Sequence, residues 1–329
     1  MLTPSAERLI QRLADGELHS GDALARELGV TRAAVWKQLH QLKALGLSLE
    51  SVRGQGYRLT DPISLLNPND IRACLSPGAR RDLAHLDIFP LIDSTNAYLL
   101  GLPPSDDIAR ARVCLAEYQS AGRGRRGRRW ASPFGANIYL SLSWRFDDMP
   151  HDISTLSLAC GVMTVRALQR CGASEISLKW PNDLVWHGRK LAGLLIEMRA
   201  EAAGRCDVVV GIGVNVTMPA DAAKEIEQDW VDLKQVLGGA APDRNVIAGH
   251  MLDELLTGLE CFFERGFAPF REQWQALDML SGQAVRIEHN GQWRDGVAEG
   301  IDAQGAIKVR HGTEVRHYLS GDVTLRTLT

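Results

Sequence analysis

The chain has 329 residues, of which 45% are hydrophobic and 23% are charged. This composition is ordinary for globular proteins and excludes disordered, collagen-like and fibrous classes, while the length predicts two or three domains. Thirty-seven Lys and Arg against 40 Asp and Glu leave a formal net charge of -3, so any site for a polyanion must be a local patch.

The six cysteines are scattered without a C-x-x-C pair. The sequence therefore indicates neither a zinc cluster nor a disulfide framework, and it favours a reducing compartment. No apolar run approaches the roughly 18 residues that a membrane helix needs, and the N-terminus carries charge before any apolar stretch. We expect a soluble cytoplasmic protein without a membrane partner.

Apolar residues recur at helical spacing through residues 5–45, which predicts three short helices. Between the second and the third, Gly29 can supply the left-handed residue of a tight turn and Thr31 can cap the next helix. The glycine-rich turn at 54–56 then separates two short apolar stretches, as in a two-stranded wing. Residues 1–62 are therefore predicted to form a winged helix-turn-helix DNA-binding domain.

Prolines and asparagines interrupt the periodicity at 61–70, where we place the first boundary. Helical patterns at 155–169 and 246–264 are then interspersed with apolar strands at 137–142 and 208–212, which predicts an α+β or α/β domain over 63–276. From residue 280 onward, turn pairs such as Asn290-Gly291 separate short strands. Residues 277–329 are predicted to form a small β-barrel.

Residues 122–130 read GRGRRGRRW and satisfy the dinucleotide-binding pattern G-x-G-x-x-G literally. We reject that fold because Pro133 and Gly135 prevent the helix that must open at the third glycine. Five arginines within seven residues repel one another, so the empty loop should be open and an anionic ligand should order it. A solvated basic run and a nucleic-acid patch are the alternatives, and the segment alone does not exclude them.

Four further segments carry polar side chains or glycines next to predicted strands: DSTN at 93–96, KWPND at 179–183, KLAG at 190–193 and GIGVN at 211–215. Each has a purely structural alternative, such as a helix cap for Ser94 or a β-turn for Pro181-Asn182-Asp183. Glycines in a strand, such as Gly193, often mark close approach of a ligand or of another backbone. The sequence shows no Ser-His-Asp arrangement, metal-spaced histidine pair or P-loop, which counts against hydrolase, zinc and P-loop enzymes.

Together with EYQ at 117–119 and GRGRRG at 122–127, these segments resemble in order the motifs of the biotin protein ligase family. The whole chain is similar to the bifunctional members that also repress the biotin operon. The resemblance implies an α+β multidomain protein with a class II aminoacyl-tRNA-synthetase-like α/β catalytic domain and a C-terminal SH3-like β-barrel.

The resemblance also implies that biotin, ATP and Mg²⁺ are the ligands. Biotin would be activated to biotinyl-5′-AMP and transferred to a lysine of the biotin carboxyl carrier protein of acetyl-CoA carboxylase. Loaded with the adenylate, the chain would form a homodimer that binds biotin operator DNA and represses biotin biosynthesis. A non-catalytic biotin-sensing repressor and a lipoate or octanoate ligase of the same fold are the alternatives.

The resemblance assigns roles to individual positions. The biotin-binding residues would be Ser94, Thr95, Asn96, Gln119, Arg123, Gly124, Arg125 and Lys190. Those for ATP and the adenylate would be Gly122, Arg125, Arg126, Arg128, Trp130, Asn182, Asp183 and Asn215, with Asp183 also a ligand of Mg²⁺. Lys190 and Arg125 would act in catalysis by holding the carboxyl oxygen and offsetting charge at the α-phosphorus. The DNA-binding residues would be Thr31, Arg32, Trp36, Lys37 and His40, although Trp36 could instead be packed inside.

Overall fold

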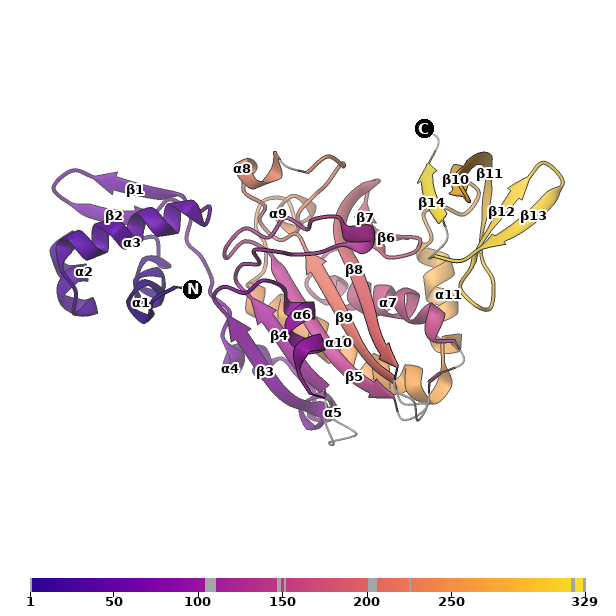
Figure 1. Ribbon diagram of the computed structural model, residues 1–329, viewed down its shortest axis with the longest axis horizontal. Coiled ribbons are helices and arrows are strands. Elements are labelled where there is room, and N and C mark those ends of the chain that lie inside the picture. The colour runs from indigo at the N-terminus through magenta and orange to yellow at the C-terminus, as the bar shows by residue number, and fades with distance from the viewer. Residues whose placement is uncertain are drawn as a thin grey trace.

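Three groups of elements follow one another in the computed structural model (Figure 1), which describes residues 2–103, 111–146, 149–150, 152–200, 206–224, 226–320 and 323–327. Helices and a hairpin make the N-terminal group, a seven-stranded sheet with helices makes the central group, and a five-stranded sheet makes the C-terminal group. Over these ranges, every helix is too short or too polar to cross a membrane.

The N-terminal group is the predicted winged helix-turn-helix. It comprises α1 (Pro4–Leu13), α2 (Gly21–Leu28), α3 (Arg32–Ala44), β1 (Leu49–Val52) and β2 (Gly56–Leu59). Gly29 is left-handed with φ 66°, and the Thr31 hydroxyl accepts a hydrogen bond from the Ala34 amide at 3.2 Å. The local turn and cap chemistry therefore acts as the sequence predicts.

The central sheet has the strand order β3-β4-β5-β9-β8-β7-β6. Its strands are β3 (Leu83–Phe89), β4 (Ala111–Ala116), β5 (Ile138–Phe146), β6 (Ile176–Lys179), β7 (Asp183–Trp186), β8 (Arg189–Ala200) and β9 (Cys206–Val214). Strands β3 and β4 pair in parallel, whereas the other neighbours pair antiparallel. The central domain is therefore α+β rather than a parallel α/β domain.

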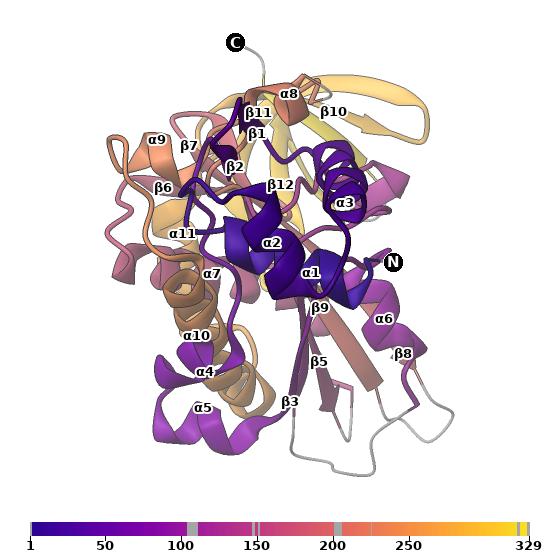
Figure 2. The same cartoon turned by 90° about the vertical axis from the view of Figure 1, so that its left-hand side faces the viewer.

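Two long helices, α7 (Leu156–Arg170) and α10 (Arg244–Arg265), cover one face of this sheet, and α6 (Thr95–Gly101) lies on the other (Figure 2). They confirm the helical patterns predicted over 155–169 and 246–264. The shorter helices are α4 (Pro68–Ala73), α5 (Pro77–Asp82), η1 (Arg125–Gly127), η2 (Ile153–Thr155), α8 (Ala220–Ala223), α9 (Leu233–Val236) and α11 (Ala268–Leu277).

The C-terminal group is an antiparallel sheet of order β13-β12-β11-β10-β14. Its strands are β10 (Ala284–His289), β11 (Gln292–Ile301), β12 (Ile307–His311), β13 (Glu314–Tyr318) and β14 (Val323–Thr327). Asn290 and Gly291 both have positive φ, as the predicted hairpin requires. The described pairings leave β13 and β14 at opposite edges, so the predicted closed barrel is not confirmed. Turn residues specify hairpins, but closure depends on pairing between distant edge strands.

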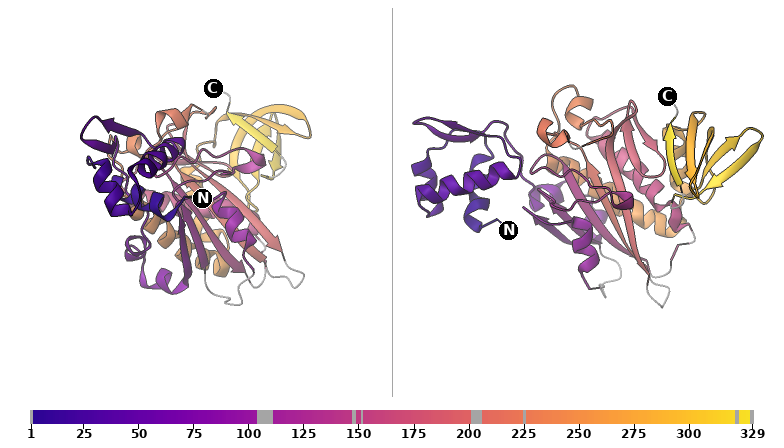
Figure 3. Two further views of the ribbon diagram at one scale, coloured as in Figure 1. Left: turned by 60° about the vertical axis from the view of Figure 1, so that its left-hand side comes forward. Right: turned by 45° about the horizontal axis from the view of Figure 1, so that its top comes forward.

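The outer groups lie at opposite ends of the central one (Figure 3), and each is joined to it by buried contacts. Phe134 packs into the core of the N-terminal group. At the other end, Trp180 Nε1 donates to the Gly305 carbonyl at 3.0 Å, and the Met279 amide donates to the Leu178 carbonyl at 3.0 Å.

Candidate functional site

A cavity of about 550 Å³ opens where β5, β8 and β9 meet the segment that follows β4. It brings together the residues predicted to bind biotin and ATP, except Gly122: Ser94, Thr95, Asn96, Gln119, Arg123, Gly124, Arg125, Arg126, Arg128, Trp130, Asn182, Asp183, Lys190 and Asn215. Gly122 lies at the base of the loop, where its carbonyl accepts from the Trp130 amide at 2.9 Å. Residues from segments as far apart as 94 and 215 therefore converge on one space.

One end of the cavity is a network of neutral polar groups around the first turn of α6. Ser94 caps this helix, and the Thr95 amide and hydroxyl donate to Gln119 Oε1 at 2.9 and 3.1 Å. Gln119 Nε2 in turn donates to the Ser132 hydroxyl at 3.2 Å. The sequence allowed Ser94 to be either a helix cap or part of a binding site. In the structure it caps α6 and also lines the polar end of the cavity.

Two residues that sequence reasoning missed, Ser141 and Glu197, complete this network. Ser141 is buried on β5, with its Oγ 2.7 Å from Thr95 Oγ1 and 2.5 Å from Asn96 Oδ1. Glu197 on β8 accepts from Asn96 Nδ2 at 2.9 Å and lies 3.4 Å from Arg123 Nη2. Neither could be found from local sequence, because only the strand order brings them to Asn96.

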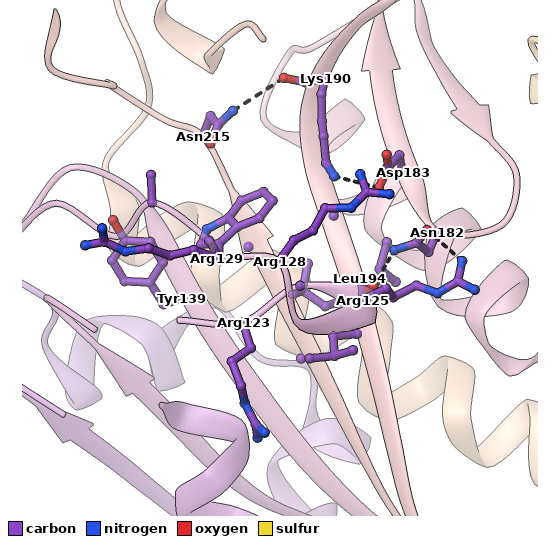
Figure 4. A pocket seen from close by; sticks show the side chains of 18 of the residues that line it. Arg123, Arg125, Arg128, Arg129, Tyr139, Asn182, Asp183, Lys190, Leu194 and Asn215 are labelled. Atoms are coloured by element: carbon purple, nitrogen blue, oxygen red, sulfur yellow. Dashed lines mark hydrogen bonds and ion pairs between the residues drawn. The ribbon is translucent and has the colours of Figure 1, made fainter. Parts of the chain in front are cut away.

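The arginine–glycine loop, residues 122–130, folds along the cavity with the short helix η1 at its tip. The Gly124 amide donates to the Arg128 carbonyl at 2.7 Å, and Arg126 and Gly127 both have positive φ. In Figure 4, Arg125 and Arg128 extend toward the side that holds Asn182, Asp183 and Lys190, whereas Arg123 extends the other way, toward Glu197. The loop therefore places cations at one end of the cavity.

Arg125 is held at both ends of its guanidinium. Its Nη1 donates to Asn182 Oδ1 at 3.3 Å, and its Nη2 donates to the Ser320 carbonyl of the C-terminal group. Burial, together with repulsion from Arg126 and Arg128, lowers the pKa of Arg125. Asp183 offsets only part of this effect, so the half-buried guanidinium gains from an anionic ligand that supplies further countercharge.

Lys190 lies opposite the loop at the start of β8. Its Nζ is 2.9 Å from Asp183 Oδ1 and 5.4 Å from the centre of the Trp130 ring. Asn182 adjoins this pair and uses its Nδ2 to donate to the Leu194 carbonyl at 2.7 Å. The predicted turn at 181–183 does connect two strands, and it also directs Asn182 and Asp183 at the cationic end.

The glycines of β9 make room for side chains of the chain itself. A Cβ at Gly211 would lie 2.2 Å from Asn96, and a Cβ at Gly213 would lie 2.4 Å from the Trp130 ring. The glycines of this strand do mark a close approach, and at Gly213 the approaching group is the indole of Trp130. Trp130 Nε1 is buried and has no hydrogen-bond partner among the described residues, so it remains a donor for a bound ligand.

Asn215 acts on the backbone that borders the cavity. Its Nδ2 donates to the Val231 carbonyl at 3.1 Å and to the Lys190 carbonyl at 3.4 Å. Trp230, which the sequence did not single out, lines the cavity beside this anchor. Asn215 therefore lines the cavity and also holds the 229–231 segment against β8, while the nucleotide contact predicted for it stays a prediction.

A buried ion pair lies behind the polar end. Arg244 Nη2 is 2.5 Å from Glu117 Oε2, and both side chains are almost fully buried. Arg244 also donates to the Ser64 carbonyl, and Glu117 Oε1 accepts from the Leu66 amide at 2.6 Å. The pair therefore fixes the linker at residues 64–66, which follows the helix-turn-helix, to the end of β4. Gln119 lies just beyond this end of the strand.

Comparison with known proteins agrees with this arrangement. Residues 88–215 match the biotin/lipoate A/B protein ligase family, residues 6–58 an HTH domain and residues 280–326 the biotin protein ligase C terminal domain. The chain is 38% identical over 320 residues to the bifunctional ligase/repressor BirA of Escherichia coli, with 97% of each chain covered. The chain belongs to the biotin protein ligase family.

Two further members and one structure agree with this assignment. BirA of Bacillus subtilis is 29% identical over 95% of each chain. The biotin--[acetyl-CoA-carboxylase] ligase of Mycobacterium tuberculosis is 36% identical over 80% of this chain and 98% of its own. A biotin protein ligase from Aquifex aeolicus in complex with biotin and ATP has the same fold, with a TM-score of 0.62 at 24% identity over 75% of this chain and 100% of that one. The chain is thus a biotin ligase with a helix-turn-helix repressor domain, which favours this activity over a lipoate ligase or a sensor without catalysis.

The predicted DNA-binding residues lie apart from the cavity, on α3 and at its N-cap. Thr31 is occupied as the helix cap, whereas Arg32, Lys37 and His40 are exposed. Trp36, which the sequence left open, is 56% exposed and points away from the core of its domain. The structure therefore leaves this side chain accessible to a partner.

The described residues hold no group of three or more His, Cys, Asp or Glu side chains that could bind a metal ion. All six cysteines are free. Asp183 offers one carboxylate at the cationic end of the cavity, which fits an ion that takes most of its ligands from phosphate and water.

Proposed function

We propose that the cavity joins biotin to ATP and then presents the product to an acceptor amine. A single observation carries this proposal: one continuous space has a neutral polar end, at Thr95 and Gln119, and a cationic end, at Arg125 and Lys190. Biotinyl-5′-AMP has the same sequence of chemistry, with a neutral ureido ring, an apolar chain and an acyl phosphate.

At the neutral end, Ser94, Thr95, Asn96 and Gln119 bind the ureido ring of biotin. Their hydroxyls and amides are already held in place by Ser141 and Glu197, so few rotamers are lost on binding. Leu195, which lies on the same face of β8 as Gly193 and Glu197, lines the cavity and suits the valeryl chain.

At the cationic end, the biotin carboxylate attacks the α-phosphorus of ATP, the bond from this phosphorus to the bridging oxygen breaks, and pyrophosphate leaves. Gly124 and Arg125 hold the carboxylate together with Arg123, which must turn from Glu197 to reach it, while Arg125, Arg126 and Arg128 offset the charge that develops on the phosphoryl oxygens. Lys190 holds the carboxyl oxygen, and for this it exchanges part of its contact with Asp183 for the ligand. Arg125 and Lys190 are therefore the catalytic residues of the proposal.

The nucleotide lies beside Trp130, whose ring and buried Nε1 suit an adenine, with Gly122 keeping the base of the loop closely packed. Asn182 and Asp183 orient the triphosphate, and Asp183 is the residue that would hold Mg²⁺, which neutralises phosphate charge when bound. Asn215 lines the cavity as a weaker contact of the nucleotide, and it also supports the 229–231 segment.

In the second step, the ε-amine of an acceptor lysine attacks the acyl carbon of the mixed anhydride. The bond from this carbon to the oxygen shared with phosphorus breaks, AMP leaves with that oxygen, and the amine gives up a proton as the amide forms. The nucleophiles of both steps come from the substrates, so the chain itself needs none. The acceptor in this proposal is the biotin carboxyl carrier protein of acetyl-CoA carboxylase, which is consistent with the Mycobacterium tuberculosis relative, a biotin--[acetyl-CoA-carboxylase] ligase.

The regulatory half of the proposal is that the adenylate-loaded chain forms a homodimer that binds biotin operator DNA. One helix-turn-helix makes few phosphate contacts, so tight binding needs two on a two-fold site. We also propose a division into residues 1–62, 63–276 and 277–329, with the antiparallel central sheet related to class II aminoacyl-tRNA synthetases and the C-terminal sheet to an SH3-like barrel.

The test supplies the purified chain with biotin, MgATP and a carrier domain, and measures pyrophosphate and biotinylated carrier separately. We expect pyrophosphate from biotin and ATP alone, followed by labelling of the carrier. A chain that binds biotin but releases no pyrophosphate would be a sensor only, and labelling with lipoate in place of biotin would indicate the related ligase.

A further inference from the structure

Trp36 is a large apolar side chain held in the open on the outer face of α3. The core side of this helix consists of Val35, Leu39 and Leu42, which are buried, whereas Trp36 is 56% exposed. An exposed indole on a short helix has no folding role that requires it, since removing it uncovers no core. Its position instead suits contact with a partner.

His40, one helical turn further on, holds the indole in place. The two ring centroids lie 3.9 Å apart, and His40 Nδ1 lies 3.0 Å from the Trp36 carbonyl oxygen. Because a carbonyl only accepts, Nδ1 must carry the proton and donate, which fixes the orientation of the imidazole. Contact with His40 therefore restricts the rotamers of the Trp36 side chain, so this side chain loses little conformational entropy on binding.

The charges of α3 are cationic. The helix carries Arg32, Lys37 and Lys43 and no acidic residue, and Arg32 is 3.5 Å from Asp22 of α2, so Lys37 and Lys43 carry most of this charge. The partner that fits an exposed pair of rings on a cationic helix is double-stranded DNA, whose phosphates pair with the cations while base edges face the helix. The thymine C5-methyl group is the apolar feature that the major groove presents.

We infer that Trp36, held by His40, contacts the C5-methyl group of a thymine and so makes one position of each half-site specific for thymine. This inference rests on the proposed binding of operator DNA. His40 is a positioning residue in this account, because it acts through the indole.

The test begins by selecting binding sites from random double-stranded DNA with the full chain, supplied with biotin and MgATP. Each thymine of the enriched site is then replaced by deoxyuridine, which removes only the methyl group. We expect one replacement per half-site to weaken binding by about fourfold, the value of one buried methyl group. Trp36→Ala should bind the thymine and deoxyuridine sites equally well, and His40→Ala should show a reduced difference between them.

Trp293→Ala is the matched control, since this tryptophan is 45% exposed but belongs to the C-terminal group. It should retain the full preference for thymine. The inference is wrong if the wild-type chain tolerates deoxyuridine at every thymine, or if Trp36→Ala keeps the wild-type preference. If no sequence is enriched at all, the proposed operator binding is wrong, and the inference falls with it. If a site is enriched but shows no dependence on the thymine methyl group, only the inference is wrong.

Discussion

Replacing Arg125 tests whether the arginine–glycine loop retains the adenylate. The guanidinium is half-buried at the cationic end, between Asn182 and the Ser320 carbonyl, and like-charged neighbours surround it. A phosphate oxygen would replace or join these neutral acceptors in a charge-assisted hydrogen bond. Such a bond is worth about 1.5–3 kcal/mol, so losing one speeds release of the adenylate by roughly 10- to 150-fold.

The assay forms the adenylate from labelled biotin and ATP in the absence of an acceptor, and follows its release from the chain. Arg125→Ala should release the adenylate roughly 10- to 150-fold faster than the wild type. The release rate of Arg125→Lys should be closer to that of Arg125→Ala than to that of the wild type, because an ammonium cannot reproduce the planar fork of a guanidinium. Arg189→Ala is the matched control. This arginine adjoins Lys190 in sequence but lies over the Trp186 ring, with its guanidinium 5.2 Å from the ring centre and outside the cavity. Equal release from Arg125→Ala and the wild type would refute the role of the loop.

Four other outcomes follow from the structure. Gly213→Ala places a Cβ 2.4 Å from the Trp130 ring, and the resulting displacement should raise KM for ATP at least about fivefold; an unchanged KM would contradict the packing. Burial raises the pKa of Asp278 above 3.8, so its charge destabilises the fold at neutral pH; Asp278→Asn should raise Tm at pH 7 and lose this advantage near pH 3.8, whereas an equal effect at both pH values would exclude a charge effect. Lys37→Ala should reduce the slope of log K for DNA against log salt by about 1 per bound chain, and an unaltered slope would place Lys37 away from phosphate. Trypsin should cut the arginine–glycine loop more slowly once biotin and ATP are bound, and equal rates would show that its order does not depend on ligand.

The features that the sequence predicts correctly are set by neighbours in the chain. Gly29 and Thr31 specify a turn and a cap through their own backbone and hydroxyl, and Asn290-Gly291 specifies a hairpin. Helices α7 and α10 also follow from periodicity, because their apolar positions repeat over several turns.

The features that it does not predict depend on strand order. Ser141 reaches Asn96 only because β5 lies between β4 and β9, beneath α6. The glycines of β9 signalled an unusual close approach, but the sequence could not show that Asn96 and Trp130 are the groups that approach. Whether the C-terminal sheet closes into a barrel cannot be predicted for the same reason. Closure requires pairing in register between the two edge strands, which no local signal encodes.

The buried pair of Glu117 and Arg244 gives the two halves of the protein a shared support. Glu117 holds the Leu66 amide, and Arg244 holds the Ser64 carbonyl, so the linker from the repressor domain is tied to the end of β4. Two residues later, Gln119 accepts hydrogen bonds from Thr95 at the neutral end of the cavity. Breaking a buried ion pair is costly, so the pair keeps the linker and the end of β4 together. One chain of contacts therefore connects the neutral end of the cavity to the attachment of the helix-turn-helix.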